Sequence, residues 1–336
     1  MMQHFRTEIN IPESPFKISY GDKIMMMGSC FTEHIGAAME RLLFRVDVNP
    51  FGIVYNPVSL TEGLNVLLEN REFTKDDLIC YNESWHSFMH HGRFSGGDPD
   101  KCLENINGRL CRSGKFIREA EYLFMTFGTA FIYRYKKTGK IVSNCHKLPA
   151  QEFERSMAGA DEIVMVVKET VSSLYKANPG IKIIFTVSPV RHLKDGAVGN
   201  QLSKSTLIIA IHKILEEIPG TSYFPSYEIM MDDLRDYRFY DDDMVHPAGN
   251  ARSYIQEKYA DVYFSEETKK LVSDIEKIVR AKEHRPYHPE GNAYMKFLVA
   301  QIEQIKELGS KNLLVDTRQL KEYFEEKLKK VMNKDA

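Results

Sequence analysis

The hydrophobic residues of this 336-residue chain alternate between short continuous runs and stretches with helical spacing. A continuous apolar run bounded by polar residues is typical of a strand buried in a parallel sheet. Such runs predict strands at 23–28, 122–127 and 181–187. A short extended piece at 45–48, which ends at Asn49-Pro50, and a last strand at 222–229 are also predicted, with a hairpin formed by 131–135 and 140–143. Apolar residues three and four apart predict helices at 31–43, 59–68, 160–177 and 203–217. Repeated strand–helix units predict an α/β fold with a mostly parallel sheet and helices on both faces.

The pattern changes near residue 264, where amphipathic helices replace the strand–helix units. These helices are predicted at 271–278, 295–308 and 320–331, with a break rich in proline, histidine and glycine at 284–291. We therefore divide the chain into a main domain, 1–265, and a helical extension, 266–336. The extension either packs on the main domain or gives a homo-oligomer its interface.

Composition excludes several classes of partner. The net charge is -2 and no basic patch with interleaved aromatic residues is evident, so we expect no nucleic-acid partner. The N-terminus lacks the apolar region of a signal peptide, and no apolar run approaches the ~20 residues of a membrane span. The five cysteines are odd in number and form no CxxC pair, which favours reduced thiols and a cytoplasmic protein; export by an unrecognised route is the alternative.

Ser29 is the first candidate for chemistry. The strand at 23–28 stops at Gly28, and a helix follows directly, which places Ser29 at the carboxyl edge where open α/β sheets bind ligands. A serine hydroxyl is a weak nucleophile until a base takes its proton, and the N–H groups of the following helix would stabilise a developing oxyanion. The alternative is that Ser29 only caps the helix.

The segment Asp243-Met244-Val245-His246-Pro247 supplies the missing base and acid. In Asp-x-x-His, His246 would accept the serine proton while Asp243 orients the ring and stabilises the imidazolium. Pro247 at a first helical position would place His246 just outside a helix. The alternative is an acidic capping turn. If the three residues form a triad, its members follow in the chain order Ser, Asp, His.

Other histidines and cysteines are weaker candidates. His86, His90 and His91 raise the question of a metal, but no Glu base or third carboxylate stands at ligand spacing, so neither metal nor cofactor is expected. A loop around His86 that lines the substrate site is the preferred interpretation. Cys30, beside Ser29, is interpreted as a packing residue rather than the nucleophile.

Several ordered motifs resemble the GSCFA family, which is related to the SGNH (GDSL-type) hydrolases. The resemblance covers roughly residues 20–260. It rests on Gly28-Ser29-Cys30-Phe31, Asn49-Pro50-Phe51-Gly52, Ser188-Pro189-Val190-Arg191-His192 and Asp243-Met244-Val245-His246-Pro247. The family is named after the motif Gly-Ser-Cys-Phe-Ala, and in this chain Thr32 occupies the position of the final Ala.

The resemblance implies a flavodoxin-like three-layer α/β/α sandwich and ester or acyl chemistry, with Ser29 as nucleophile and Asp243 and His246 as its partners. SGNH enzymes form the oxyanion hole from the serine N–H, a glycine N–H and an asparagine side chain. Gly52 is the candidate glycine, or else part of a plain turn. The asparagine slot holds Ala130, and Thr129 or Asn144 are the substitutes considered.

The motif after the strand at 181–187 reaches the same sheet edge. Arg191 is predicted to hold an anionic or hydroxyl-rich substrate, and His192 to hydrogen-bond near the crevice; a surface loop is the alternative. The resulting hypothesis is a serine esterase or deacylase that acts on an acylated small molecule or carbohydrate through an acyl-enzyme. An acyltransferase with the same triad is one alternative, and a non-catalytic carbohydrate-binding protein on a hydrolase scaffold is the other.

Overall fold

A computed structural model of the chain describes residues 7–333. The chain divides into two compact units, each built from separate stretches of sequence. Within the described residues, unit 1 consists of 7–14, 23–36 and 46–262. Unit 2 consists of 15–22, 37–45 and 263–333. Every candidate site residue named above therefore belongs to unit 1.

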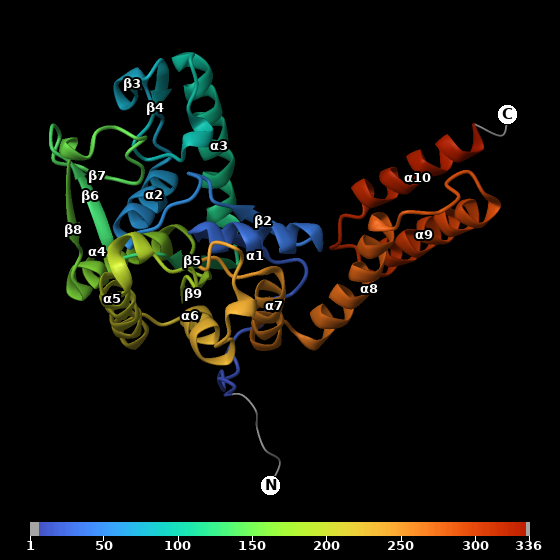
Figure 1. Cartoon of the computed structure of the whole chain (residues 1–336). Coiled ribbons are helices and arrows are strands. Elements are labelled where there is room, and N and C mark those ends of the chain that lie inside the picture. Colours follow the sequence, from blue (N-terminus) through green and yellow to red (C-terminus); the bar gives the residue numbers. More distant parts are fainter. Residues whose placement is uncertain (1–6, 334–336) are drawn as a thin grey trace, which may run out of the picture. The chain divides into compact units, whose positions relative to one another are not determined.

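Unit 1 is built on a five-stranded sheet in the order β10-β9-β5-β1-β2 (Figure 1). The strands are β1 (Lys23–Gly28), β2 (Arg45–Val48), β5 (Tyr122–Phe127), β9 (Lys182–Val187) and β10 (Thr221–Phe224). The β1–β5, β5–β9 and β9–β10 pairs are all parallel, as the continuous apolar runs predict. The register pairs Gly28 with Thr126 and Thr126 with Thr186, so three strands end level at one edge.

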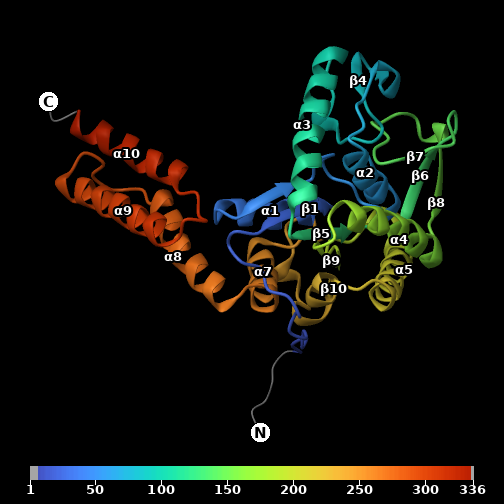
Figure 2. The same ribbon diagram turned by 180° about the vertical axis from the view of Figure 1, so that it is seen from behind.

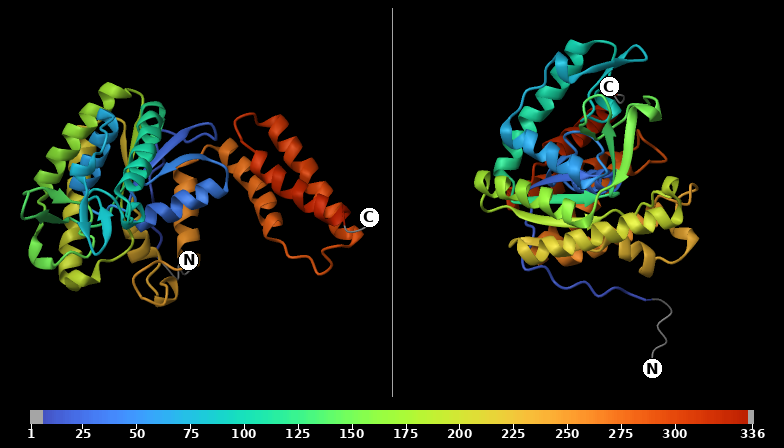
Figure 3. Two further views of the ribbon diagram at one scale, coloured as in Figure 1. Left: turned by 90° about the horizontal axis from the view of Figure 1, so that it is seen from above. Right: turned by 90° about the vertical axis from the view of Figure 1, so that its left-hand side faces the viewer.

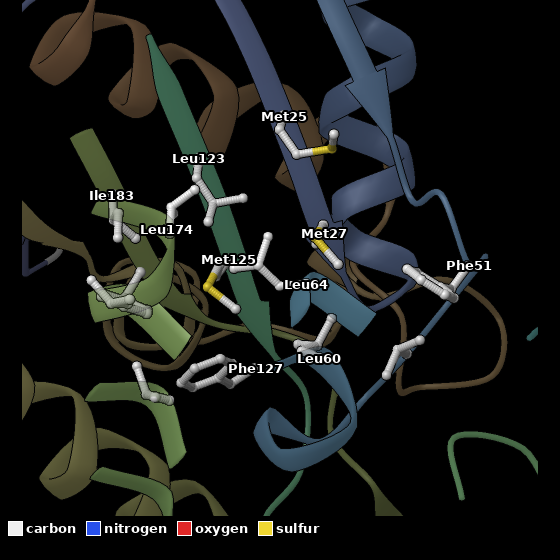
Figure 4. Close-up of a cluster of buried hydrophobic side chains, with 14 of the residues drawn as sticks. Met25, Met27, Phe51, Leu60, Leu64, Leu123, Met125, Phe127, Leu174 and Ile183 are labelled. Atoms are coloured by element: carbon white, nitrogen blue, oxygen red, sulfur yellow. The ribbon is translucent and has the colours of Figure 1, made fainter. Parts of the chain in front are cut away.

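Helices cover both faces of this sheet (Figures 1 and 2). They are α1 (Cys30–Arg41), α2 (Pro57–Glu69), α3 (Pro99–Glu119), α4 (Ala160–Ala177), α5 (Gly196–Glu217) and α7 (Gly249–Tyr263). Side chains of α2 to α5 pack with alternate residues of β1, β5 and β9 into one buried cluster, part of which Figure 4 shows. On the other face, Tyr259 of α7 contacts Phe124 and Phe224, with ring centroids 5.5 Å apart in each case. The α/β/α sandwich predicted from the sequence is confirmed.

Two smaller sheets lie outside the central one. β6 (Phe131–Tyr135) pairs antiparallel with β7 (Ile141–Val142), as the predicted hairpin requires, and with β8 (Phe153–Met157). β3 (Ile79–Tyr81) and β4 (Ser84–His86) form a second hairpin. His86 thus ends a strand rather than sharing a helical face with His90, so the helical spacing considered for these histidines is wrong.

The predicted last strand, 222–229, is also partly wrong. β10 ends at Phe224 because Pro225 cannot continue a ladder, and the chain then forms α6 (Ser226–Glu228) and a π-helical turn (Ile229–Asp233). The helix predicted at 203–217 begins earlier, at Gly196.

Unit 2 joins α8 (Glu266–Glu283), α9 (Asn292–Lys311) and α10 (Arg318–Met332) to two segments from the N-terminal part of the chain (Figure 3). The Ile18 N–H donates to the Tyr263 carbonyl at 2.6 Å, and the Phe44 ring contacts Phe264, with centroids 5.0 Å apart. Ile275 and Phe324 are fully buried. The three predicted C-terminal helices are therefore present. Among the described residues, no helix has both the length and the apolar character needed to cross a membrane.

Candidate active site

The end of β1 holds Ser29 in a fixed position. The Gly28 N–H donates to the Asn49 side-chain carbonyl at 2.8 Å, and the Gly28 carbonyl accepts from the Val54 N–H at 3.0 Å. Gly28 has φ +150°, and a Cβ there would lie 2.4 Å from the Thr126 carbonyl oxygen, so only glycine is accommodated. The Ser29 carbonyl accepts from the Thr32 N–H at 2.9 Å and thereby starts α1.

The Ser29 side chain is 1% exposed, and its Oγ has no hydrogen-bond partner. A buried hydroxyl without a partner is uncommon in protein interiors. The capping interpretation of Ser29 gains no support, because its Oγ accepts no N–H from the first turn of α1. The Ser29 hydroxyl therefore lies unengaged at the N-terminus of α1.

A cavity of about 360 Å³ opens at this edge of the sheet. Its walls include Cys30 at the start of α1, residues of the loop after β9 and His246 from the loop before α7. Ser29 itself is not a wall residue, whereas its neighbour Cys30 is. Residues from three distant stretches of sequence therefore meet at one cavity beside Ser29.

His246 is oriented by Asp243. The His246 Nδ1 lies 2.6 Å from the Asp243 Oδ2, while Asp243 Oδ1 accepts the backbone N–H groups of Val245 and His246 at 2.9 Å each. These hydrogen bonds lower the pKa of Asp243 to about 2. The bond from the His246 backbone N–H contributes most, and the bond from the His246 ring comes second. With Nδ1 bound to a carboxylate, the His246 Nε2 is left as the proton acceptor.

The loop that carries this pair is braced from α7. Arg252 donates to the Pro247 carbonyl at 2.7 Å and to the Asp241 carboxylate at 3.0 Å, and the Asp241 N–H donates to the His246 carbonyl at 2.8 Å. Tyr240 and Pro247 form an isolated β-bridge, and α7 begins at Gly249. Pro247 is therefore not the first helical residue, contrary to the sequence-based expectation.

Arg191 and His192 both line the cavity. The His192 N–H donates to the Asn200 side-chain carbonyl at 2.8 Å, and its ring packs edge-on to Tyr55 with centroids 5.2 Å apart. Burial lowers the pKa of His192 to about 4, so its ring is neutral at pH 7. A neutral imidazole here can hydrogen-bond a ligand without adding charge.

Three predicted site residues lie away from the cavity walls. The Gly52 N–H donates to the Asn49 carbonyl at 2.8 Å and is used within its own turn. The Asn144 side chain accepts the His146 N–H at 2.9 Å. His86 engages Ser95 Oγ at 2.8 Å through Nδ1 and the Tyr81 carbonyl at 3.2 Å through Nε2. None of these three lines the cavity that His246 and Cys30 share.

Ala130 occupies the position at which the asparagine of SGNH enzymes was expected. Its side chain is fully buried and packs in the hydrophobic core. Thr129 lines the cavity, but its hydroxyl is 3.0 Å from Ser203 Oγ and accepts the Phe131 N–H at 3.1 Å. The Thr129 hydroxyl is thus engaged by Ser203 and Phe131, and Ala130 has no side-chain donor.

Asn56 is a cavity residue that sequence reasoning missed. Its Oδ1 accepts the Ser59 N–H at 2.8 Å and caps α2, which fixes the plane of the amide. The Nδ2 group makes no hydrogen bond with a described residue and is not sealed in the interior, so it can donate to a molecule in the cavity. The signal in the sequence is the pair Asn56-Pro57, which is typical of a helix start.

Cys30 is the other candidate nucleophile at this position. Burial, the largest effect, raises the pKa of its thiol, which keeps the sulfur protonated and unreactive near pH 7. No group of three or more His, Cys, Asp or Glu side chains within residues 7–333 is arranged to hold a metal ion.

Comparison with known families accounts for these motifs. The model of the GSCFA family matches residues 23–259, and that of the GSCFA domain protein, C-terminal domain, matches residues 275–330. The chain belongs to the GSCFA family. In this GSCFA protein the first match falls almost entirely within unit 1 and the second within α8 to α10 of unit 2. No curated protein matches the sequence.

Solved structures similar to the GSCFA chain include three esterases. A carbohydrate esterase family 3 enzyme from Talaromyces cellulolyticus is 10% identical, with 75% of this chain and 99% of that chain covered and a TM-score of 0.35. An acetyl xylan esterase from Butyrivibrio proteoclasticus is 12% identical, with 77% and 66% covered and a TM-score of 0.38. A mutant acetyl esterase with acetate ion is 11% identical, with 76% and 99% covered and a TM-score of 0.35. Similarity at this level carries no argument about the substrate of this chain.

Proposed function

We propose that this GSCFA protein is a serine esterase or deacylase that acts on an acylated small molecule or carbohydrate. One observation carries the proposal: His246, oriented by Asp243 at 2.6 Å, opens onto the same cavity as the start of α1 directly behind Ser29. A base with its orienting acid and an unengaged serine hydroxyl at a helix N-terminus are the groups that acyl transfer uses.

In the proposed reaction the substrate carbonyl approaches through the cavity that Cys30 lines. The His246 Nε2 takes the Ser29 proton as Oγ attacks the carbonyl carbon, and Asp243 stabilises the imidazolium that forms. His246 then gives the proton to the leaving alcohol oxygen as the ester C–O bond breaks. Water, deprotonated by the same nitrogen, attacks the acyl-enzyme and releases the acid and free Ser29.

The oxyanion of each tetrahedral intermediate needs hydrogen-bond donors. The Ser29 N–H makes no hydrogen bond to a described residue, and we assign it as the first donor. We assign Asn56 Nδ2 as the second donor. It would take the role of the SGNH asparagine, whose position in this chain is held by Ala130. A donor of this kind is worth roughly 10²–10³ in turnover.

Acyl transfer to a sugar hydroxyl would use the same steps with an alcohol in place of water. Product analysis separates the two, since only hydrolysis releases free acid in stoichiometric amount.

The first test is a panel of short-chain p-nitrophenyl esters together with a fluorophosphonate probe that labels activated serines. We expect hydrolysis and labelling by the wild type and by Cys30→Ala, and loss of both in Ser29→Ala and His246→Ala. Labelling that survives Ser29→Ala but disappears in Cys30→Ala would overturn the assignment of the nucleophile. Absence of labelling in the folded wild type would count against a serine hydrolase altogether.

A further inference from the structure

The charges around the cavity are unbalanced. Its walls carry three cationic side chains, Arg155, Arg191 and Lys194, but a single carboxylate, Asp195. Asp195 forms an ion pair with Arg155, whose guanidinium also lies over the Phe131 ring at 3.8 Å. One positive charge is therefore neutralised, and two remain at the cavity without a counter-ion.

Arg191 is the cation of this cavity whose guanidinium lacks a hydrogen-bond acceptor at a buried atom. Its Nε is buried and has no hydrogen-bond partner, although a buried guanidinium N–H without an acceptor is strongly unfavourable. Arg191 and Lys194 form no ion pair with any residue in the described part of the chain. Both follow β9, on the loop that also brings His192 to the cavity.

A fully buried lysine adds further positive potential behind this loop. Lys204 Nζ donates to the Gly128 carbonyl at 2.8 Å and to the Ser188 carbonyl at 2.7 Å, at the ends of β5 and β9. It forms no ion pair within residues 7–333. Burial, and to a smaller extent the field of Arg191, lowers the pKa of Lys204 to about 7, so its charge is partial near neutral pH. An anion bound at Arg191 would favour the charged form of Lys204 and gain from it.

Three carboxylates of the surrounding elements have partners other than Arg191. Glu33 of α1 pairs with Arg93 at 3.0 Å, and both oxygens of Glu228 accept the Tyr223 hydroxyl at 2.8 Å. Asp243 is committed to His246. The protein therefore supplies no internal anion to Arg191, and an anion from a ligand would be attracted to it.

We propose that the substrate carries an anionic group, a carboxylate or a phosphate, beside the ester that is cleaved, and that Arg191 binds this group with Lys194 at the entrance. The proposal rests on the esterase function above and narrows its substrate class to acylated acidic compounds such as acidic sugars. The planar guanidinium suits a carboxylate or phosphate because two parallel N–H donors match two oxygens.

The hydrolysis test uses matched acetyl esters: methyl glucoside, methyl glucuronoside and methyl glucoside 6-phosphate. For the wild type we expect kcat/KM to be at least about tenfold higher for one of the anionic esters than for the neutral one. The better anion distinguishes a carboxylate from a phosphate. In Arg191→Met the ratio of anionic to neutral ester should fall to about one, Arg191→Lys should restore part of it, and the exposed control Arg112→Met should leave it unchanged.

A binding measurement makes the site testable without turnover. Calorimetry on the Ser29→Ala protein with glucuronate, glucose 6-phosphate and glucose should show binding of at least one anion, no comparable binding of glucose, and loss of the anion in a folded Arg191→Met variant. Equal rates for neutral and anionic esters, an unchanged ratio in Arg191→Met, or no anion binding would overturn the inference. Anion binding without any ester hydrolysis would retain the site and overturn the esterase.

Discussion

Asn56 offers the sharpest test of the proposed mechanism, because the two ends of one side chain have separable roles. Its Oδ1 caps α2 through the Ser59 N–H at 2.8 Å, while its Nδ2 is the proposed oxyanion donor. Asn56→Asp keeps the capping oxygen and removes the donor. Asn56→Ala removes both.

The two variants should therefore differ in stability and agree in catalysis. Loss of the cap in Asn56→Ala should lower the free energy of unfolding by about 0.5–2 kcal/mol. Asn56→Asp should stay near the wild type, because Asp is an equally good N-cap residue and favours the helix N-terminus electrostatically. Both should lower kcat by a factor of roughly 10²–10³, and the Asp variant by more, since its charge repels the oxyanion.

The measurements are kcat on the best ester of the panel and the urea midpoint at the same pH. A folded Asn56→Asp protein whose kcat stays within about fivefold of the wild type, against the roughly hundredfold loss expected for a missing donor, would refute the oxyanion assignment. Loss of activity in Asn56→Ala alone would indicate a role in folding only. Asn144→Asp, away from the cavity, is the matched control and should leave kcat unchanged.

Three further predictions concern other parts of unit 1. Asp243→Asn should lower kcat by roughly 10²–10⁴ without a large change in KM, because the amide cannot stabilise the protonated His246; a kcat near that of the wild type would remove Asp243 from the mechanism. Gly28→Ala should destabilise by about 2–4 kcal/mol, since its Cβ would meet the Thr126 carbonyl at 2.4 Å at φ +150°, whereas Gly139→Ala, at φ +69° in open space, should cost only about 1 kcal/mol; equal urea midpoints would contradict this. Burial lowers the pKa of His90 to about 3 from 6.5, so the unfolded state binds the extra proton between these values and the free energy of unfolding should fall as pH falls through that window. His90→Phe should make this decline shallower by at most about 1.4 kcal/mol per pH unit, and unfolding curves with the wild-type pH dependence would show that His90 does not contribute.

The sheet was predictable because its strands carry the strongest local signal. β1, β2 and β5 have the predicted bounds, because β1 and β5 are compact apolar runs that stop at glycine and the extended piece of β2 stops at Asn49-Pro50. α3 was not among the predicted helices, although Asp98 caps it, Pro99 begins it, and its buried residues Cys102, Ile106 and Leu110 recur at the helical spacing of four.

The candidate site was only partly predictable, for a different reason. Asp243 and His246 are close in sequence, so their contact follows from local geometry. The meeting of His246, Arg191 and Asn56 at one cavity depends on how loops fold over the sheet edge, which no local spacing encodes. The turn that uses the Gly52 N–H was one of the two interpretations of Asn49-Pro50-Phe51-Gly52, whereas no local pattern indicates that the Thr129 hydroxyl contacts Ser203.

The composition of unit 2 has a consequence for how the chain folds during synthesis. Its segments 15–22 and 37–45 leave the ribosome early, but their partners from residue 263 onward are made last. Tyr20 and Phe44 stack with ring centroids 4.3 Å apart, and Phe264, which contacts Phe44, is not synthesised until most of the chain has been translated. Apolar surface exposed for so long is prone to aggregate or to bind chaperones. A chain cut after residue 262 would keep that surface uncovered permanently, so removing the C-terminal part of unit 2 would expose apolar side chains of its N-terminal segments.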